Sequence, residues 1–166
     1  MGSVLAGGAR PVTEERCAGC GRKVEGGSEG CQARYEQLLA RDYEAPAFFA
    51  VHRMFVDTYS LQHPGRYCGS AKSLAAHLVG LGQILEDGIS PASGGPGLRR
   101  WLDGTRELDK PPLPEARGEI TLGDVERIDE AGAWRVAVQA WAVSTWRAYA
   151  ELHPLARKWA EEAKLA

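Results

Sequence analysis

The stretch PAFFAVHRMFVDTYSLQH, residues 46–63, decides the fold that we expect for this chain. Pro46 suits the first turn of a helix, because its missing N–H would have no helical partner there. Apolar and aromatic side chains then recur at helical spacing until Pro64-Gly65 ends the pattern. The stretch therefore predicts one continuous helix from Pro46 to about His63.

Similar patterns on both sides of this stretch extend the prediction to an all-α protein, a bundle of about four main helices. Short turns join the predicted helices, which favours antiparallel packing of neighbours. Ser70 is a suitable N-cap for the helix after the turn. The other predicted segments run from about Gln32 to Tyr43, from Ser70 to about Asp87, from about Ala131 to Ala150, and from Pro154 through Trp159 as a final turn or helix.

Glycine and proline divide the chain. We expect a flexible leader over residues 1–16 and a single helical domain over 17–166, which begins with a Gly/Cys-rich module at 17–31. A Pro/Gly-rich loop is expected over 88–119, with a short helical turn at Leu98–Leu102. Thr121 and Asp124 then form an approximate capping box for a short segment.

The composition excludes some classes of protein. The chain has 166 residues, with 20 Lys+Arg against 22 Asp+Glu, and a net charge of -2 argues against a nucleic-acid partner. No apolar run is long enough for a membrane span, and the first residues do not resemble a signal peptide. We therefore expect a cytoplasmic protein whose four cysteines are thiols or metal ligands rather than disulfides.

Cysteine spacing carries the clearest chemical signal. Cys17-Ala-Gly-Cys20 lets two thiolates reach one ion from a tight turn, and Cys31 follows at the expected start of the first helix. Three thiolates and one further ligand would make a closed tetrahedral Zn²⁺ site. If the first two helices are antiparallel, the fourth ligand is His63 or Cys68, and we rank His63 first because Cys68 lies in a turn.

Three other interpretations of the cysteines stay open. They could be unligated thiols in a flexible leader. Cys17 and Cys20 could be a redox pair, but that motif follows a strand, and we expect no strand before Cys17. An iron–sulfur cluster would use all four cysteines.

The histidines suggest a second site on the helices. His52 and His63 share a helix face with Tyr59, and antiparallel packing would place His77 level with Val56–Asp57. His52 and His77, with His153, could then hold a metal or a substrate, and Asp57 could orient His77. The alternative is that these rings are hydrogen-bonded core residues, satisfied by partners such as Ser73 and Tyr59.

Several stretches together resemble an uncharacterised family, domain of unknown function 5946. The run from Pro46 to Gly65 resembles its central signature, and the supporting motifs are Cys17-x-x-Cys20-Gly21, Ser28-x-Gly30-Cys31, Tyr35-Glu36-x-Leu-Leu-Ala-Arg-Asp-Tyr43, Ser70-x-x-Ser73-x-Ala-x-His77-Leu78 and Trp141-Ala-x-Ser-x-Trp146. The resemblance covers most of residues 17–160. It implies no named activity, but it matches the family pattern at Cys17, Cys20, Cys31, His52, Asp57, Gln62, His63, Ser73 and His77. Family members do not usually carry a cysteine at the place of Cys68, and they often have a histidine before the third cysteine.

These observations predict a zinc-binding helical protein in which Cys17, Cys20, Cys31 and His63 hold a mainly structural metal. It would act as a binding or regulatory module for a small molecule or a protein, with a groove at Tyr59, Gln62 and Ser73. The alternative is a metal-dependent enzyme acting on a small molecule, with His52, Asp57 and His77 as its catalytic candidates.

Overall fold

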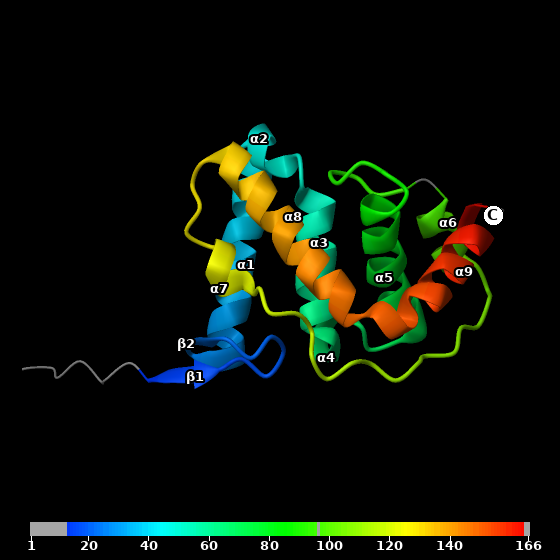
Figure 1. The fold of residues 1–166 in the computed structure, drawn as a ribbon, viewed down its shortest axis with the longest axis horizontal. Coiled ribbons are helices and arrows are strands. Elements are labelled where there is room, and N and C mark those ends of the chain that lie inside the picture. Colours follow the sequence, from blue (N-terminus) through cyan, green and yellow to red (C-terminus); the bar gives the residue numbers. More distant parts are fainter. Residues whose placement is uncertain (1–12, 96, 165–166) are drawn as a thin grey trace, which may run out of the picture.

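Helices joined by short turns make up most of the chain in a computed structural model that describes residues 13–95 and 97–164 (Figure 1). Most of the expected leader, residues 1–12, lies outside the described residues. The elements are β1 Glu14–Arg16, β2 Lys23–Glu25, α1 Gly27–Glu44, α2 Pro46–Phe49, α3 His52–Gln62, α4 Pro64–Tyr67, α5 Ala71–Leu85, α6 Leu98–Asp103, α7 Leu122–Val125, α8 Ala131–Ala148, the 3₁₀ turn η1 Ala150–Leu152, and α9 His153–Lys164.

The α3 helix is the centre of the arrangement. It packs against α5 on one side and α8 on another, α9 covers α5, and α1 lies beside α3 with the β1–β2 hairpin at its end (Figure 1). Within the described ranges, five helices are eleven residues or longer, so a count of four main helices is not confirmed. None of the described helices is both long and apolar enough to cross a membrane.

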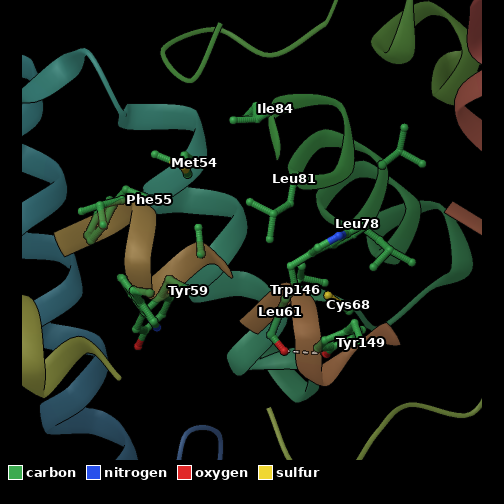
Figure 2. Packing of buried hydrophobic residues seen from close by; sticks show 14 of the residues in the cluster. Met54, Phe55, Tyr59, Leu61, Cys68, Leu78, Leu81, Ile84, Trp146 and Tyr149 are labelled. Atoms are coloured by element: carbon green, nitrogen blue, oxygen red, sulfur yellow. Dashed lines mark hydrogen bonds between the residues drawn. The ribbon is translucent and has the colours of Figure 1, made fainter. Parts of the chain in front are cut away.

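The core lies where α3, α5 and α8 meet (Figure 2). Phe55 of α3, Leu78 of α5 and Trp141 of α8 are all fully buried. The hydroxyl of Tyr149 donates a 2.6 Å hydrogen bond to the carbonyl of Leu61, which ties the end of α8 to α3 (Figure 2). This packing holds the C-terminal end of α3, and with it His63, in a fixed place.

The predicted continuous helix over 46–63 is wrong, because the chain breaks into α2 and α3 at Ala50 and Val51. Val51 is buried in the core, with φ −122° and ψ 16°. The N–H of Met54 donates to the carbonyl of Pro91. A contact with a loop far along the chain thus replaces a helical hydrogen bond, and local spacing cannot reveal it.

The N-terminal segment also differs from expectation. The α1 helix begins at Gly27, so Cys31 lies in its second turn and not at its start. The expectation of no strand before Cys17 is wrong as well, since β1 pairs antiparallel with β2, Glu15 opposite Val24. Three-residue strands in a glycine-rich segment show too little alternation to be predicted.

Cap predictions agree with the structure. Ser70 and Ser73 form a reciprocal capping box at the start of α5, and Thr121 and Asp124 form one at α7. The expected short helical turn at Leu98–Leu102 is α6.

Candidate metal centre

The β1–β2 hairpin presents Cys17 and Cys20 from one tight turn. The N–H of Cys17 donates to the carbonyl of Arg22, and the N–H of Gly21 donates to the carbonyl of Cys17, both at 2.8 Å. Gly21 has φ +77°, a left-handed conformation that favours glycine. The backbone thus closes around the two thiols as the CxxC spacing predicts.

Two helices bring the other ligands to this turn. Cys31 projects from α1, and His63 is the residue at which α3 ends. The three sulfurs and one histidine nitrogen all lie within 4.8 Å of one another. The cluster therefore joins the hairpin, α1 and α3, and its fourth member is the residue that we ranked first.

Two of the separations between ligand atoms match the edges of a tetrahedral zinc site. Bonds of about 2.3 Å to sulfur and about 2.0 Å to nitrogen give tetrahedral edges of about 3.8 Å between sulfurs and about 3.5 Å between sulfur and nitrogen. The Sγ atoms of Cys20 and Cys31 are 3.9 Å apart, and the Sγ of Cys31 is 3.5 Å from Nε2 of His63. Four side chains thus stand where one tetrahedral ion could bind all of them.

Tyr59 orients His63. The Nδ1–H of His63 donates a 2.7 Å hydrogen bond to the carbonyl of Tyr59, and the two rings stack with centroids 3.8 Å apart. With the proton held on Nδ1, the lone pair of Nε2 is directed at the sulfurs. A partner on the second ring nitrogen is the usual arrangement for a metal-binding histidine.

The site is sheltered from water and favours thiolate. Cys17, Cys31 and His63 are buried, and Cys20 is half-buried. Hydrogen bonding by Cys20, then by His63 and Tyr59, lowers the pKa of Cys31 to about 4, although burial opposes this. The same contact with Cys31 and burial raise the pKa of Cys20. These contacts favour the thiolate form of Cys31, which is the form that binds a metal ion.

Close backbone contacts and an ion pair hold the hairpin in place. A Cβ on Gly19 would overlap Cδ2 of His63, and a Cβ on Gly30 would overlap the carbonyl of Glu25. Arg22 forms a bidentate ion pair with Glu126, in which Nη2 donates to Oε1 at 2.9 Å and Nη1 donates to Oε2 at 3.2 Å. The ligands therefore stand on a backbone with little room to move.

Cys68 lies apart from this group. It is fully buried, its thiol contacts the carbonyl of Ser60 at 3.7 Å, and burial raises its pKa to about 12. Because Cys68 is outside the group, the arrangement does not suit an iron–sulfur cluster bound by four cysteines. It does not suit a redox pair of Cys17 and Cys20 either, since strand β2 and not a helix follows Cys20.

The remaining histidines have separate partners. Nδ1 of His52 lies 3.2 Å from Asp42, Nδ1 of His77 lies 2.8 Å from Asp57, and Nε2 of His153 lies 2.8 Å from the carbonyl of Trp146. Among the described residues, the cluster at Cys31 is the one group of three or more metal-ligating side chains. Asp57 does meet His77, as antiparallel packing predicts.

The three residues predicted to line a groove make different contacts. Tyr59 and Gln62 are fully buried. The two N–H groups of the Gln62 side-chain amide donate to the carbonyls of Arg117 and Ile120, and the hydroxyl of Thr145 lies 3.1 Å from the same nitrogen. These contacts hold the loop before α7, and α8, against α3. Ser73 caps α5.

Gln32 is a part of the site that sequence reasoning missed. The oxygen of its side-chain amide accepts a 3.3 Å hydrogen bond from the hydroxyl of Tyr59. The same hydroxyl lies 3.7 Å from the sulfur of Cys31. Its position directly after a cysteine ligand was the only signal. Arg22 and its partner Glu126 gave none, because more than a hundred residues separate them.

Comparison with protein families matches residues 15–150 to a family of unknown function, DUF5946. Comparisons with curated proteins and with solved structures gave no match. The matched range includes all four members of the Cys/His cluster and both acid–histidine pairs. The chain belongs to the family of unknown function DUF5946.

Proposed function

We propose that this protein is a zinc-binding helical module in which Cys17, Cys20, Cys31 and His63 hold one structural ion. The observation that carries the proposal is the geometry of the four ligand atoms, all within 4.8 Å of one another. Thiolate and imidazole ligands in a tetrahedral arrangement suit Zn²⁺ better than the oxygen-preferring Mg²⁺ or Ca²⁺. A reducing compartment such as the cytoplasm would keep the thiols free to bind it.

A structural role follows from the number and burial of the ligands. Four protein ligands complete a tetrahedron, whereas a catalytic zinc site usually keeps one position for water or substrate. The ion would also fasten the hairpin to the junction of α1 and α3. The hairpin needs such a link because it contributes few buried side chains of its own. We therefore assign the action of the protein to binding a small molecule or a protein partner on the surface that the ion shapes.

Elemental analysis of protein purified without added metal tests this proposal. We expect one zinc per chain, lost in Cys17→Ser and in His63→Ala. Cys68→Ser is the matched control, a buried cysteine outside the cluster, and it should keep the metal. Protein without metal, or equal metal loss in Cys68→Ser, would contradict the proposal.

A second candidate function is enzymatic and rests on the His77–Asp57 pair. Asp57 is fully buried and holds Nδ1 of His77, so that Nε2 remains for proton transfer or for a metal, and the His77 side chain is 15% exposed. A second metal equivalent that His77→Ala removes while the fold persists would favour this function. A single equivalent, unchanged in His77→Ala, favours the structural proposal.

A further inference from the structure

A cavity of about 290 Å³ lies directly beside the proposed zinc site. Its walls come from the turn of the hairpin, the first turns of α1, the end of α3, and α4. Arg117, in the loop between α6 and α7, lines it as well. The side chains and backbone that matter here are those of Gly19, Ser28, His63, Arg66 and Arg117. Pockets for small molecules begin near this size, so the cavity suits a small molecule and not a polymer.

Arg117 brings a guanidinium from the loop before α7 to the wall of the cavity. Its Nη1 donates a 3.2 Å hydrogen bond to the carbonyl of Gly19, but its Nε is buried and has no partner. A guanidinium is best satisfied by an oxyanion, which can accept from two of its N–H groups at once. Because Arg117 also lines the cavity, a ligand oxyanion there can pair with its positive charge.

Arg66 supplies a second positive charge from α4. Its Nη2 lies 3.2 Å from the carboxylate of Glu29, and the two side chains are 48% and 81% exposed. Exposed pairs of this kind contribute little stability, so an anion can compete for Arg66 at small cost. Ser28 adds a hydroxyl at the α1 N-terminus, where no side-chain cap is present.

The zinc site presents its least negative side to the cavity. Of the four proposed ligands only His63 lines it, while the three cysteines do not. An imidazole bound to a cation gives up electron density to the ion, and the thiolate charge stays behind it. The zinc site therefore meets the cavity with a neutral imidazole, and the charged side chains that line the cavity are Arg66 and Arg117 against the single carboxylate of Glu29.

We propose that this cavity binds a small molecule through an oxyanion, a carboxylate or a phosphate group, held by Arg66 and Arg117. The inference rests on the proposed zinc site, because Ala18 and Gly19 of the hairpin form one wall and the ion would hold them there. It adds the chemical class of the ligand to a module whose metal is structural.

The test is a titration of zinc-loaded, full-length protein with inorganic phosphate and, separately, with acetate, at fixed ionic strength. Calorimetry and backbone NMR follow the binding, and acetamide serves as the uncharged match for acetate. We expect saturable binding of at least one anion at one site, with shifts of the Gly19 and Ser28 amides, and none with acetamide. Which anion binds distinguishes phosphate from carboxylate as the ligand group.

Variants make the assignment specific. Arg66→Ala should weaken anion binding about tenfold or more, as expected for the loss of a charged hydrogen bond, and Arg117→Ala should do the same. Arg99→Ala is the matched control, because it removes an exposed arginine outside this cavity and should leave the affinity unchanged. If Arg117→Ala also loses zinc, its weaker anion binding has two possible causes, and the affinity of zinc-loaded Arg66→Ala then decides whether the cavity binds the anion.

Two results would overturn the inference. One is the absence of saturable binding of both anions to protein that carries one zinc. The other is an equal loss of affinity in Arg99→Ala and Arg66→Ala, which would indicate a general charge effect. Zinc content is measured on the same sample, so zinc-free protein contradicts the proposed function, whereas zinc-loaded protein that binds neither anion contradicts this inference alone.

Discussion

His63 shows how neighbouring atoms define the role of a single residue. The carbonyl of Tyr59, one helical turn earlier, holds its Nδ1–H, and Gly19 approaches its ring edge more closely than any other residue type could. The ring is thus fixed in tautomer and in direction before any ion binds. That preorganisation favours metal binding, because less ordering remains to be done.

Gly19→Ala should weaken the site. The added Cβ would overlap the His63 ring and would lie 2.9 Å from the carbonyl oxygen of Gln62, and crowding of this kind costs about 1–3 kcal/mol. Metal affinity, measured against a competing chelator, and the urea midpoint should both fall. Gly65→Ala is the control, since a Cβ added there would meet no atom within 4 Å. Equal behaviour of the two variants would contradict the close contact.

Asp57→Asn should destabilise the protein strongly. The carboxylate is fully buried between Nε of Arg53 and Nδ1 of His77, each at 2.8 Å, and removing one member of such a group costs about 3–5 kcal/mol. Urea unfolding measures the change. Asp103→Asn, in an exposed pair with Arg99, should change stability by less than about 0.5 kcal/mol. Similar losses in both variants would argue against the buried pairing.

At the scale of elements, the break between α2 and α3 and the capping box of α5 have opposite origins. The capping box is local, since Ser70 and Ser73 satisfy each other's backbone N–H groups three residues apart. The helix break depends on Pro91, which the chain reaches only after α5. One was therefore predictable from adjacent residues and the other was not.

Ser70→Ala should cost about 1 kcal/mol of stability, because it removes an N-cap oxygen from α5. Thermal or urea unfolding gives the difference. Ser70→Asp should restore most of it, since aspartate is also a good N-cap. If Ser70→Asp is as unstable as Ser70→Ala, the loss does not come from the cap.

The whole molecule divides into a small part that would depend on the proposed ion and a larger part that is stabilised by its own core. The hairpin has little core of its own, while Trp101, Trp134 and Trp141 are fully buried in the helical part. The helices α3, α5, α8 and α9 contact one another directly, without the residues of the Cys/His cluster. The two parts should therefore respond differently to loss of the ion.

Removal of zinc by a chelator should lower the melting temperature but keep most of the helical circular dichroism. Amide exchange should increase at the hairpin and the first turns of α1, and stay slow in α5 and α8. Readdition of zinc should reverse both changes. Complete loss of helix on chelation would show that the ion supports the entire fold.

Acid should weaken the link between α5, α8 and α9. Hydrogen bonds from Arg157 lower the pKa of Glu86, which also accepts a hydrogen bond from Trp146. Because the folded pKa is below the unfolded value of about 4.3, the contribution of Glu86 is present above that pH and is lost as the pH falls through the folded pKa. Glu86→Gln should thus be less stable than the wild type at pH 7, and the difference, measured by urea unfolding, should shrink as the pH falls through the folded pKa. A difference that stays the same size as the pH falls would contradict this role.

Much of the site followed from the sequence because its chemistry is local. The CxxC spacing of Cys17 and Cys20 predicts a two-thiolate turn, and the expected antiparallel packing of the helices on either side of Pro46 left His63 and Cys68 as the candidates for the fourth ligand. The hairpin was missed because three-residue strands carry no usable pattern. His52 and His77 are held by different carboxylates, those of Asp42 and Asp57, and local spacing could indicate only the second pairing.

The sequence by itself determined that the chain is mostly helical, which residues cap α5 and α7, and that Cys17 and Cys20 share one tight turn. These properties depend on groups within a few residues of one another. Only the tertiary structure decided that His63 and not Cys68 joins the three cysteines, that Pro91 accepts a hydrogen bond at the start of α3, and that Arg66 and Arg117 face one cavity. Those choices depend on how helices far apart in the chain pack, and packing energy is set by the complete arrangement of the core.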